Sequence, residues 1–169
     1  QFVKTTCRPS VKFDVAEPPT ESRCQAWKFQ ACPALIVGIT GANGKSTTTA
    51  LTAHLLEKAK PSGGKTGYAK VWLSGNIGHR PLLASLEQIG SRDVVVLELS
   101  SFQLEQLAEI GAAPDIALLT NVTPNHLDRH GTFEAYCAAK ENIFRLQRLD
   151  EESPAISIFN AEDPIASEW

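Results

Sequence analysis

From residue 34 onward, short apolar runs alternate with longer segments whose apolar residues recur at helical spacing. The apolar runs are rich in β-branched residues, as is typical of strands buried in a parallel sheet, and they lie at 35–39, 71–73, 93–99, 114–122 and 155–160. The helical segments lie between them, at 46–60, 80–89, 102–110 and 133–149. The first helical segment carries an apolar stripe of an amphipathic helix, made of Ala50, Leu51, Ala53, Leu55, Leu56 and Ala59. This alternation predicts an α/β fold with a mostly parallel sheet and helices on both faces.

Residues 1–33 have a different character. They hold three of the four cysteines and four of the ten prolines, and they show no sustained period of 2 or 3.6. The cysteines lack the paired spacing of a zinc site. We therefore expect a poorly patterned linker, or the remainder of a preceding domain, before one domain over 34–169. Because the sequence contains no Met, we also expect the chain to be a fragment of a longer protein.

Composition narrows the class of protein. A chain of 169 residues with 43% hydrophobic residues is long enough for one domain with a sizeable core. Its formal charge of -3 gives no electrostatic footprint for nucleic acid. No apolar run approaches the roughly 18 residues of a transmembrane helix. We therefore expect neither a nucleic-acid partner nor a membrane anchor.

The strongest local signal is ITGANGKSTTT at 39–49, which lies between a predicted strand and a predicted helix. Gly41 and Gly44 would let the backbone N–H groups and the helix N-terminus approach phosphate oxygens. Lys45 can reach the terminal phosphates, and the Ser46 hydroxyl lies where Mg²⁺ would bind. The spacing is a shortened GxxGK[ST], since Ile39 stands where the first glycine of a full phosphate loop would be. The alternative is a glycine-rich turn with an incidental lysine, which the strand–loop–helix context disfavours.

Three polar segments fall at predicted strand ends, where open α/β sheets bind ligands. Glu98 ends an apolar run, and a carboxylate there is a natural Mg²⁺ ligand or an ordinary strand-end acid. SGNIG at 74–78 could bring its backbone and the Asn76 amide close to a second anionic substrate, or it is simply a turn. The third segment, 121–133, is either a solvated loop or a cluster in which His126 is a metal ligand or general base; its polar residues are His126, Asp128, Arg129 and His130.

Five motifs occur here in the order found in one family: TGANGKSTTT, GNIG, ELSSFQLE, NVTPNHLDRHGTFEAYCAAKENIF and NAEDP. Over 34–169 the chain resembles the central ATP-binding domain of the Mur ligases, truncated at its C-terminal end. The phosphate loop and HLDRH are common to Mur ligases and, more loosely, to folylpolyglutamate synthases. ELSSFQLE resembles the D-glutamate-adding member. Asn125 departs from the pattern, because Asp is common at that position.

The resemblance implies a role for particular residues. Lys45, Glu98, His126 and Lys140 would be catalytic. Two Mg²⁺ ions would be held by Ser46, Glu98, His126 and a carbamylated Lys140. ATP would contact Gly41, Ala42, Asn43, Gly44, Lys45, Ser46, Thr47 and, near adenine, Asn160. Asn76 and His126 would contact the nucleotide-sugar substrate. Without the resemblance, Lys140 reads as an exposed lysine on a helix.

The implied activity is ATP-dependent addition of D-glutamate to UDP-N-acetylmuramoyl-L-alanine through an acyl phosphate, in peptidoglycan precursor synthesis. The resemblance also implies a monomer in the bacterial cytoplasm, and a fragment that is inactive without the remaining domains. Two alternatives stay open at this point. One is another Mur ligase or a folylpolyglutamate synthase-type ligase, and the other is a phosphate-loop nucleotide-binding module without ligase chemistry.

Overall fold

The computed structural model describes residues 34–59, 67–77, 82–147 and 155–169, so the predicted linker at 1–33 lies outside the described residues. The described strands form one five-stranded sheet in the order β2-β3-β1-β4-β5, and every neighbouring pair is parallel. Their bounds are β1 Leu35–Thr40, β2 Val71–Gly75, β3 Val94–Glu98, β4 Ile116–Leu119 and β5 Ile156–Phe159. The predicted α/β fold is confirmed.

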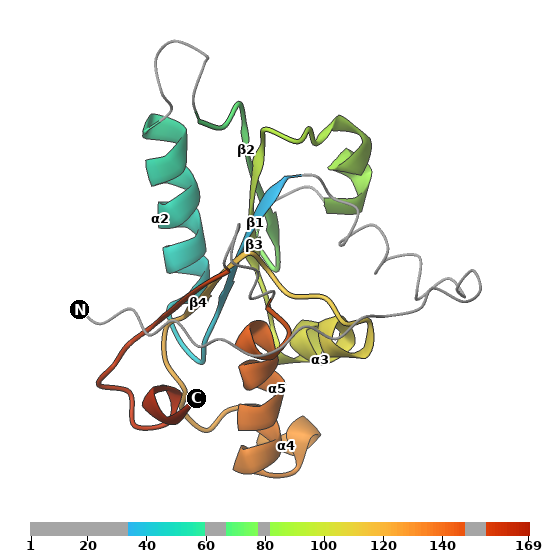
Figure 1. The fold of residues 1–169 in the computed structure, drawn as a ribbon. Coiled ribbons are helices and arrows are strands. Elements are labelled where there is room, and N and C mark those ends of the chain that lie inside the picture. The colour runs from blue at the N-terminus through green and yellow to red at the C-terminus, as the bar shows by residue number, and fades with distance from the viewer. Residues whose placement is uncertain (1–33, 60–66, 78–81, 148–154) are drawn as a thin grey trace.

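Helices cover both faces of this sheet, with α2 on one side and α3 and α5 on the other (Figure 1). The α-helices are α2 Lys45–Lys58, α3 Ser101–Glu109, α4 Leu127–His130 and α5 Phe133–Arg145; the 3₁₀ helices are η1 Leu82–Gln88 and η2 Ala166–Glu168. The helix predicted at 80–89 is therefore a 3₁₀ helix where it is described, and its end closes with an i→i+3 bond from the Ile89 N–H to the Leu86 carbonyl. The short α4 was not expected. No helix within the described ranges is long and apolar enough to cross a membrane.

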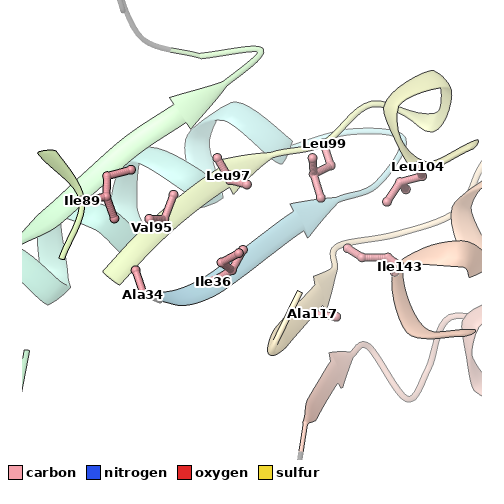
Figure 2. Close-up of a cluster of buried hydrophobic side chains, with 9 residues drawn as sticks. All are labelled: Ala34, Ile36, Ile89, Val95, Leu97, Leu99, Leu104, Ala117 and Ile143. Atoms are coloured by element: carbon pink, nitrogen blue, oxygen red, sulfur yellow. The ribbon is translucent and has the colours of Figure 1, made fainter. Parts of the chain in front are cut away.

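Strand pleating divides the core into two layers. Successive residues of β1 point to opposite faces, so Ile36 packs on the α3 and α5 side while Val37 and Ile39 pack under α2. Figure 2 shows the first layer, in which Leu104 of α3 and Ile143 of α5 lie over the strands. Burial on both faces explains why these strands are continuous apolar runs.

The apolar stripe predicted for α2 is wrong in part. Leu51 and Leu55 are exposed, and the buried residues of the helix are Thr49 and Ala53, with Leu56 packed partly against the same layer. Thr49 can be buried because its hydroxyl donates to the Lys45 carbonyl within the helix at 2.7 Å. A pattern that counts apolar residues alone misses such a self-satisfied threonine.

The strand order has a switch point beside β1. The chain runs from β1 outward to β2 on one side, and it later crosses to β4 on the other. In parallel sheets, ligands bind outside the carboxyl ends of the strands at such a switch point. The loops that follow β1, β3 and β4 therefore define the candidate site.

Candidate functional site

The loop between β1 and α2 depends on two glycines. Gly41 has φ of 152°, and a Cβ built there would lie 1.9 Å from the Thr120 Oγ1 atom. Gly44 is the N-cap of α2 with φ of 78°, a left-handed conformation that glycine adopts without strain. The sequence G-A-N-G therefore folds the backbone sharply from the strand end into the helix N-terminus.

Two residues that follow β4 hold this loop in place. Asn121 accepts from the Asn43 N–H through its side chain at 2.9 Å and from the Ala42 N–H through its carbonyl at 2.9 Å. The Thr120 hydroxyl donates to the Asn43 carbonyl at 2.7 Å. This role of Thr120 and Asn121 was not predicted from the sequence. The available signal was a polar Thr-Asn pair directly after an apolar strand.

The functional groups of the loop lie at the start of α2. The Lys45 Nζ atom donates to the Ala42 carbonyl at 3.0 Å, so the side chain folds back over the loop. Ser46 and Thr47 follow in the first turn of the helix and are exposed. An ammonium, two hydroxyl groups and a helix N-terminus therefore lie together at the start of α2, an arrangement suited to binding a polyphosphate.

Glu98 is the last residue of β3 and lies beside Ile39 of β1. It is buried, and its Oε2 atom has no hydrogen-bond partner among the described residues. Gly75 packs so closely that a Cβ there would lie 2.1 Å from the Glu98 carbonyl oxygen. The Asn76 N–H donates to that same carbonyl at 3.2 Å, so the structure places Asn76 next to Glu98. An orphaned buried carboxylate oxygen is the chemistry that a divalent cation satisfies.

Lys140 of α5 is buried at 2% exposure, which contradicts the exposed lysine expected from the sequence without the resemblance. Its Nζ atom donates to the Thr40 hydroxyl at 3.2 Å and lies 4.9 Å from the centre of the Tyr136 ring. The Thr40 hydroxyl donates in turn to the Leu99 carbonyl, beside Glu98. Burial, reinforced by the nearby Lys45 ammonium, lowers the pKa of Lys140 to about 7. The amine therefore points into the sheet edge and has a large neutral fraction near pH 7.

The other two predicted positions are exposed. His126 precedes α4 with φ of 53°, and its ring lies 5.5 Å from that of Phe102. Asn160 follows β5, and its side chain accepts from the Glu162 N–H at 3.1 Å. Asn160 thus lies two strands from β1 in the sheet. Within the described ranges no three His, Cys, Asp or Glu side chains converge as a ready metal site.

A buried carboxylate ties the end of the described chain to the site. Asp163 accepts from the Val122 N–H at 2.9 Å and from the Ile165 and Ala166 N–H groups. Burial alone would raise the pKa of Asp163, but these three backbone donors outweigh it and hold the pKa below its usual value. The acid of NAEDP therefore anchors the segment after β4, a structural role that sequence reasoning did not assign.

The model of the Mur ligase middle domain matches residues 39–169. The chain belongs to the Mur ligase family. This Mur ligase chain is 44% identical over 141 residues to UDP-N-acetylmuramoylalanine–D-glutamate ligase from Acetivibrio thermocellus, covering 83% of the chain and 27% of that relative. It is 44% identical over 137 residues to the enzyme of the same name from Clostridium botulinum strain Langeland, covering 81% of the chain and 26% of that relative. The chain thus spans about a quarter of the length of these curated relatives.

Solved structures agree with the family. MurF ligase from Thermotoga maritima in complex with ADP superposes with a TM-score of 0.63 at 27% identity, over 95% of this chain and 37% of that chain. A UDP-N-acetylmuramoyl-L-alanyl-D-glutamate–2,6-diaminopimelate ligase superposes with a TM-score of 0.61 at 25% identity, over 86% of this chain and 31% of that chain. The Mur ligase chain therefore has the fold of that family's central domain.

Proposed function

We propose that this chain is the ATP-binding part of a ligase that adds D-glutamate to UDP-N-acetylmuramoyl-L-alanine. The observation that carries the proposal is the meeting of a phosphate loop with two unusual buried groups, the orphaned Glu98 carboxylate and the Lys140 amine. A module that merely binds nucleotide has no need to bury a lysine at 2% exposure beside the loop. The names of the curated relatives at 44% identity support D-glutamate over the amino acids used by other family members.

The residues of the loop would bind ATP. Backbone N–H groups over 41–47 would hold the phosphates, and the Lys45 ammonium would neutralise charge on the transferred group. Asn160 would contact the adenine side, and Asn76 the nucleotide-sugar substrate. ADP in the solved MurF ligase supports nucleotide use in this family.

Magnesium fits the residues present. Glu98 and the Ser46 hydroxyl would hold one ion, and His126 with a carbamylated Lys140 a second. Carbamylation requires a neutral amine, which the lowered pKa of about 7 supplies near physiological pH. The Lys140 nitrogen would attack carbon dioxide and lose a proton, leaving a carbamate whose two oxygens share one negative charge. When bound, the ions would neutralise charge that develops on the phosphoryl oxygens.

The reaction would take two steps. A carboxylate oxygen of the alanyl group would attack the γ-phosphorus of ATP, and ADP would leave. The D-glutamate nitrogen would then attack the carbonyl carbon of the acyl phosphate, lose a proton and expel phosphate. Both steps build negative charge at the loop, where Lys45 and the N-terminus of α2 lie. The proposed location is the bacterial cytoplasm.

The experiment is a phosphate-release assay on the polypeptide encoded by the complete gene, with ATP and UDP-N-acetylmuramoyl-L-alanine. D-Glutamate should stimulate release, whereas L-alanine and L-lysine should not. Asn76→Ala should raise the KM for the nucleotide-sugar more than it lowers kcat. Stimulation by L-glutamate with a folate acceptor would contradict the proposal and favour a folylpolyglutamate synthase-type ligase.

A further inference from the structure

Between Val122 and α5, one buried side chain lies in an otherwise exposed segment. Residues 123–129 are all exposed, whereas the His130 side chain is 3% exposed. His130 belongs to the polar cluster of 121–133, and neither the phosphate loop nor the proposed metal sites use it. A buried imidazole in an otherwise exposed segment calls for a role.

Both ring nitrogens of His130 meet polar atoms of α3. The Nε2 atom lies 2.9 Å from the Ser101 Oγ atom, and the Nδ1 atom lies 3.5 Å from a Glu105 carboxylate oxygen. The ring stacks on Phe102 at 5.0 Å and meets the edge of Tyr136 at 5.5 Å. Two polar partners and two aromatic rings therefore fix the position and rotation of the imidazole.

This serine, histidine and glutamate have the order of a nucleophile, a base and an orienting acid. The exposure of Ser101 argues against such chemistry, because at 2% no substrate can reach its hydroxyl. Ser101 also opens α3, where Ser100 and Gln103 form a capping box. The arrangement therefore holds elements together.

What His130 holds in place is His126. Helix α4 is a single turn, and the His130 N–H donates to the His126 carbonyl at 3.0 Å. The same Phe102 ring that stacks on His130 also meets the edge of the His126 ring at 5.5 Å. His126 has φ of 53°, a left-handed conformation that a non-glycine residue keeps when its surroundings impose it. Fixing His130 thus fixes both the backbone and the ring of His126.

We propose that His130 is a positioning residue that holds the His126 imidazole at the ligand-binding edge of the sheet, through Ser101, Phe102 and the turn of α4. The motifs ELSSFQLE and HLDRH then act as one interlocked unit. This inference rests on the proposed function insofar as His126 is taken as a metal ligand. Removing the partner that orients a metal-binding histidine typically weakens metal affinity about 10–100-fold.

The test is Mn²⁺ titration, followed by electron paramagnetic resonance, of the complete gene product saturated with a non-hydrolysable ATP analogue. The variants are His130→Ala, His130→Phe, His126→Ala and the His126→Ala/His130→Ala double variant. His130→Phe keeps an aromatic ring at this position and replaces His130→Ala in the test if the alanine substitution prevents folding. Leu127→Ala is the matched control, because Leu127 is an exposed residue of the same helix.

We expect Mn²⁺ affinity to fall about 10-fold in His130→Ala, less in His130→Phe and not in Leu127→Ala, with affinity for the analogue within about 3-fold throughout. In the His126→Ala background, His130→Ala should cause no further loss, because it acts through His126. Unchanged Mn²⁺ affinity in both His130 variants, or additive losses in the double variant, would overturn the proposal.

A second measurement separates this inference from the proposed function. If His126→Ala leaves Mn²⁺ affinity unchanged, or if the wild-type protein does not bind the analogue, the proposed function is contradicted. The imidazole ¹H and ¹³C resonances of His126 then decide the positioning role. They should shift or broaden in His130→Ala and stay in place in Leu127→Ala. Unmoved His126 resonances in His130→Ala would overturn the inference.

Discussion

The two sides of the candidate site are built in different ways. On the α2 side, the candidate phosphate loop is one contiguous stretch, and Gly41 and Gly44 set the path of its backbone. On the α3 and α5 side, Lys140 and His130 owe their environment to side chains from separate elements. A site built from backbone is therefore visible in local sequence, whereas a site built from buried side chains depends on tertiary packing.

The largest expected effect lies on the loop side. Lys45→Ala should lower phosphate release by the complete gene product at least about 10²-fold, because a fixed positive charge is lost where phosphoryl charge develops. Lys58→Ala, at the exposed end of the same helix, is the matched control. Activity of Lys45→Ala within about 3-fold of wild type, less than 1 kcal/mol of barrier, would remove the phosphate-loop assignment.

On the opposite side, Lys140→Ala should lower activity at least about 10-fold, because a metal ligand is lost and even loss of a group that only orients a ligand typically costs about 10–100-fold. A free ammonium has no lone pair for Mg²⁺, so the role requires the carbamate. Added formate or acetate should restore part of the activity by filling the vacated position. The rescue distinguishes a ligand from a packing residue. Normal turnover of Lys140→Ala would show that this lysine is buried for structural reasons alone.

Much of the fold follows from local patterns. The strands were predicted because burial on both faces requires continuous apolar runs, as in Val94–Glu98. The buried face of α2 was predicted poorly, because Thr49 hides its hydroxyl in its own helix and so behaves as a core residue. The helix at 80–89 was expected, but its 3₁₀ geometry was not.

The site was predictable where chemistry and position coincide in the sequence. Gly41 and Glu98 stand at strand ends and Lys45 begins the helix that follows Gly41, so their placement at one edge follows from the parallel topology. Burial of Lys140 does not follow, because it requires the Thr40 hydroxyl, which lies 100 residues away along the chain. The resemblance to a family, not the residues, singled it out.

The free energy of unfolding should depend on pH differently in the wild type and in Lys140→Met, both in bicarbonate-free buffer. The pKa of Lys140 is about 7 in the folded chain and near 10.5 when unperturbed. Between these values the unfolded state binds more protons, so the free energy of unfolding should rise with pH, by at most about 1.4 kcal/mol per unit. Urea unfolding between pH 7 and 8.5 measures this rise in the free energy of unfolding. Lys140→Met should lack the part of the rise that comes from Lys140.

Cys137 sets the upper pH limit of this urea unfolding experiment. Burial raises the pKa of this thiol, with Glu134 and Asp163 contributing. Above the unfolded pKa of a thiol, a raised folded pKa makes stability fall as pH increases. Staying below about pH 8.5 keeps this opposite slope out of the measurement. Equal slopes in the wild type and Lys140→Met would show that Lys140 is not neutral in the folded protein.

The smallest expected effect tests whether the loop between β1 and α2 keeps its shape without the contact from Thr120. The Thr120 hydroxyl donates to the Asn43 carbonyl at 2.7 Å and also lies 3.3 Å from the Thr40 carbonyl. Thr120→Val keeps the branched shape and removes this tie, which should cost about 1 kcal/mol. Affinity for ADP should fall about 5-fold, measured by calorimetry, while the exposed Thr123→Val control should not change it. An ADP affinity of Thr120→Val equal to wild type would mean that the glycines and the α2 N-terminus shape the loop without help from β4.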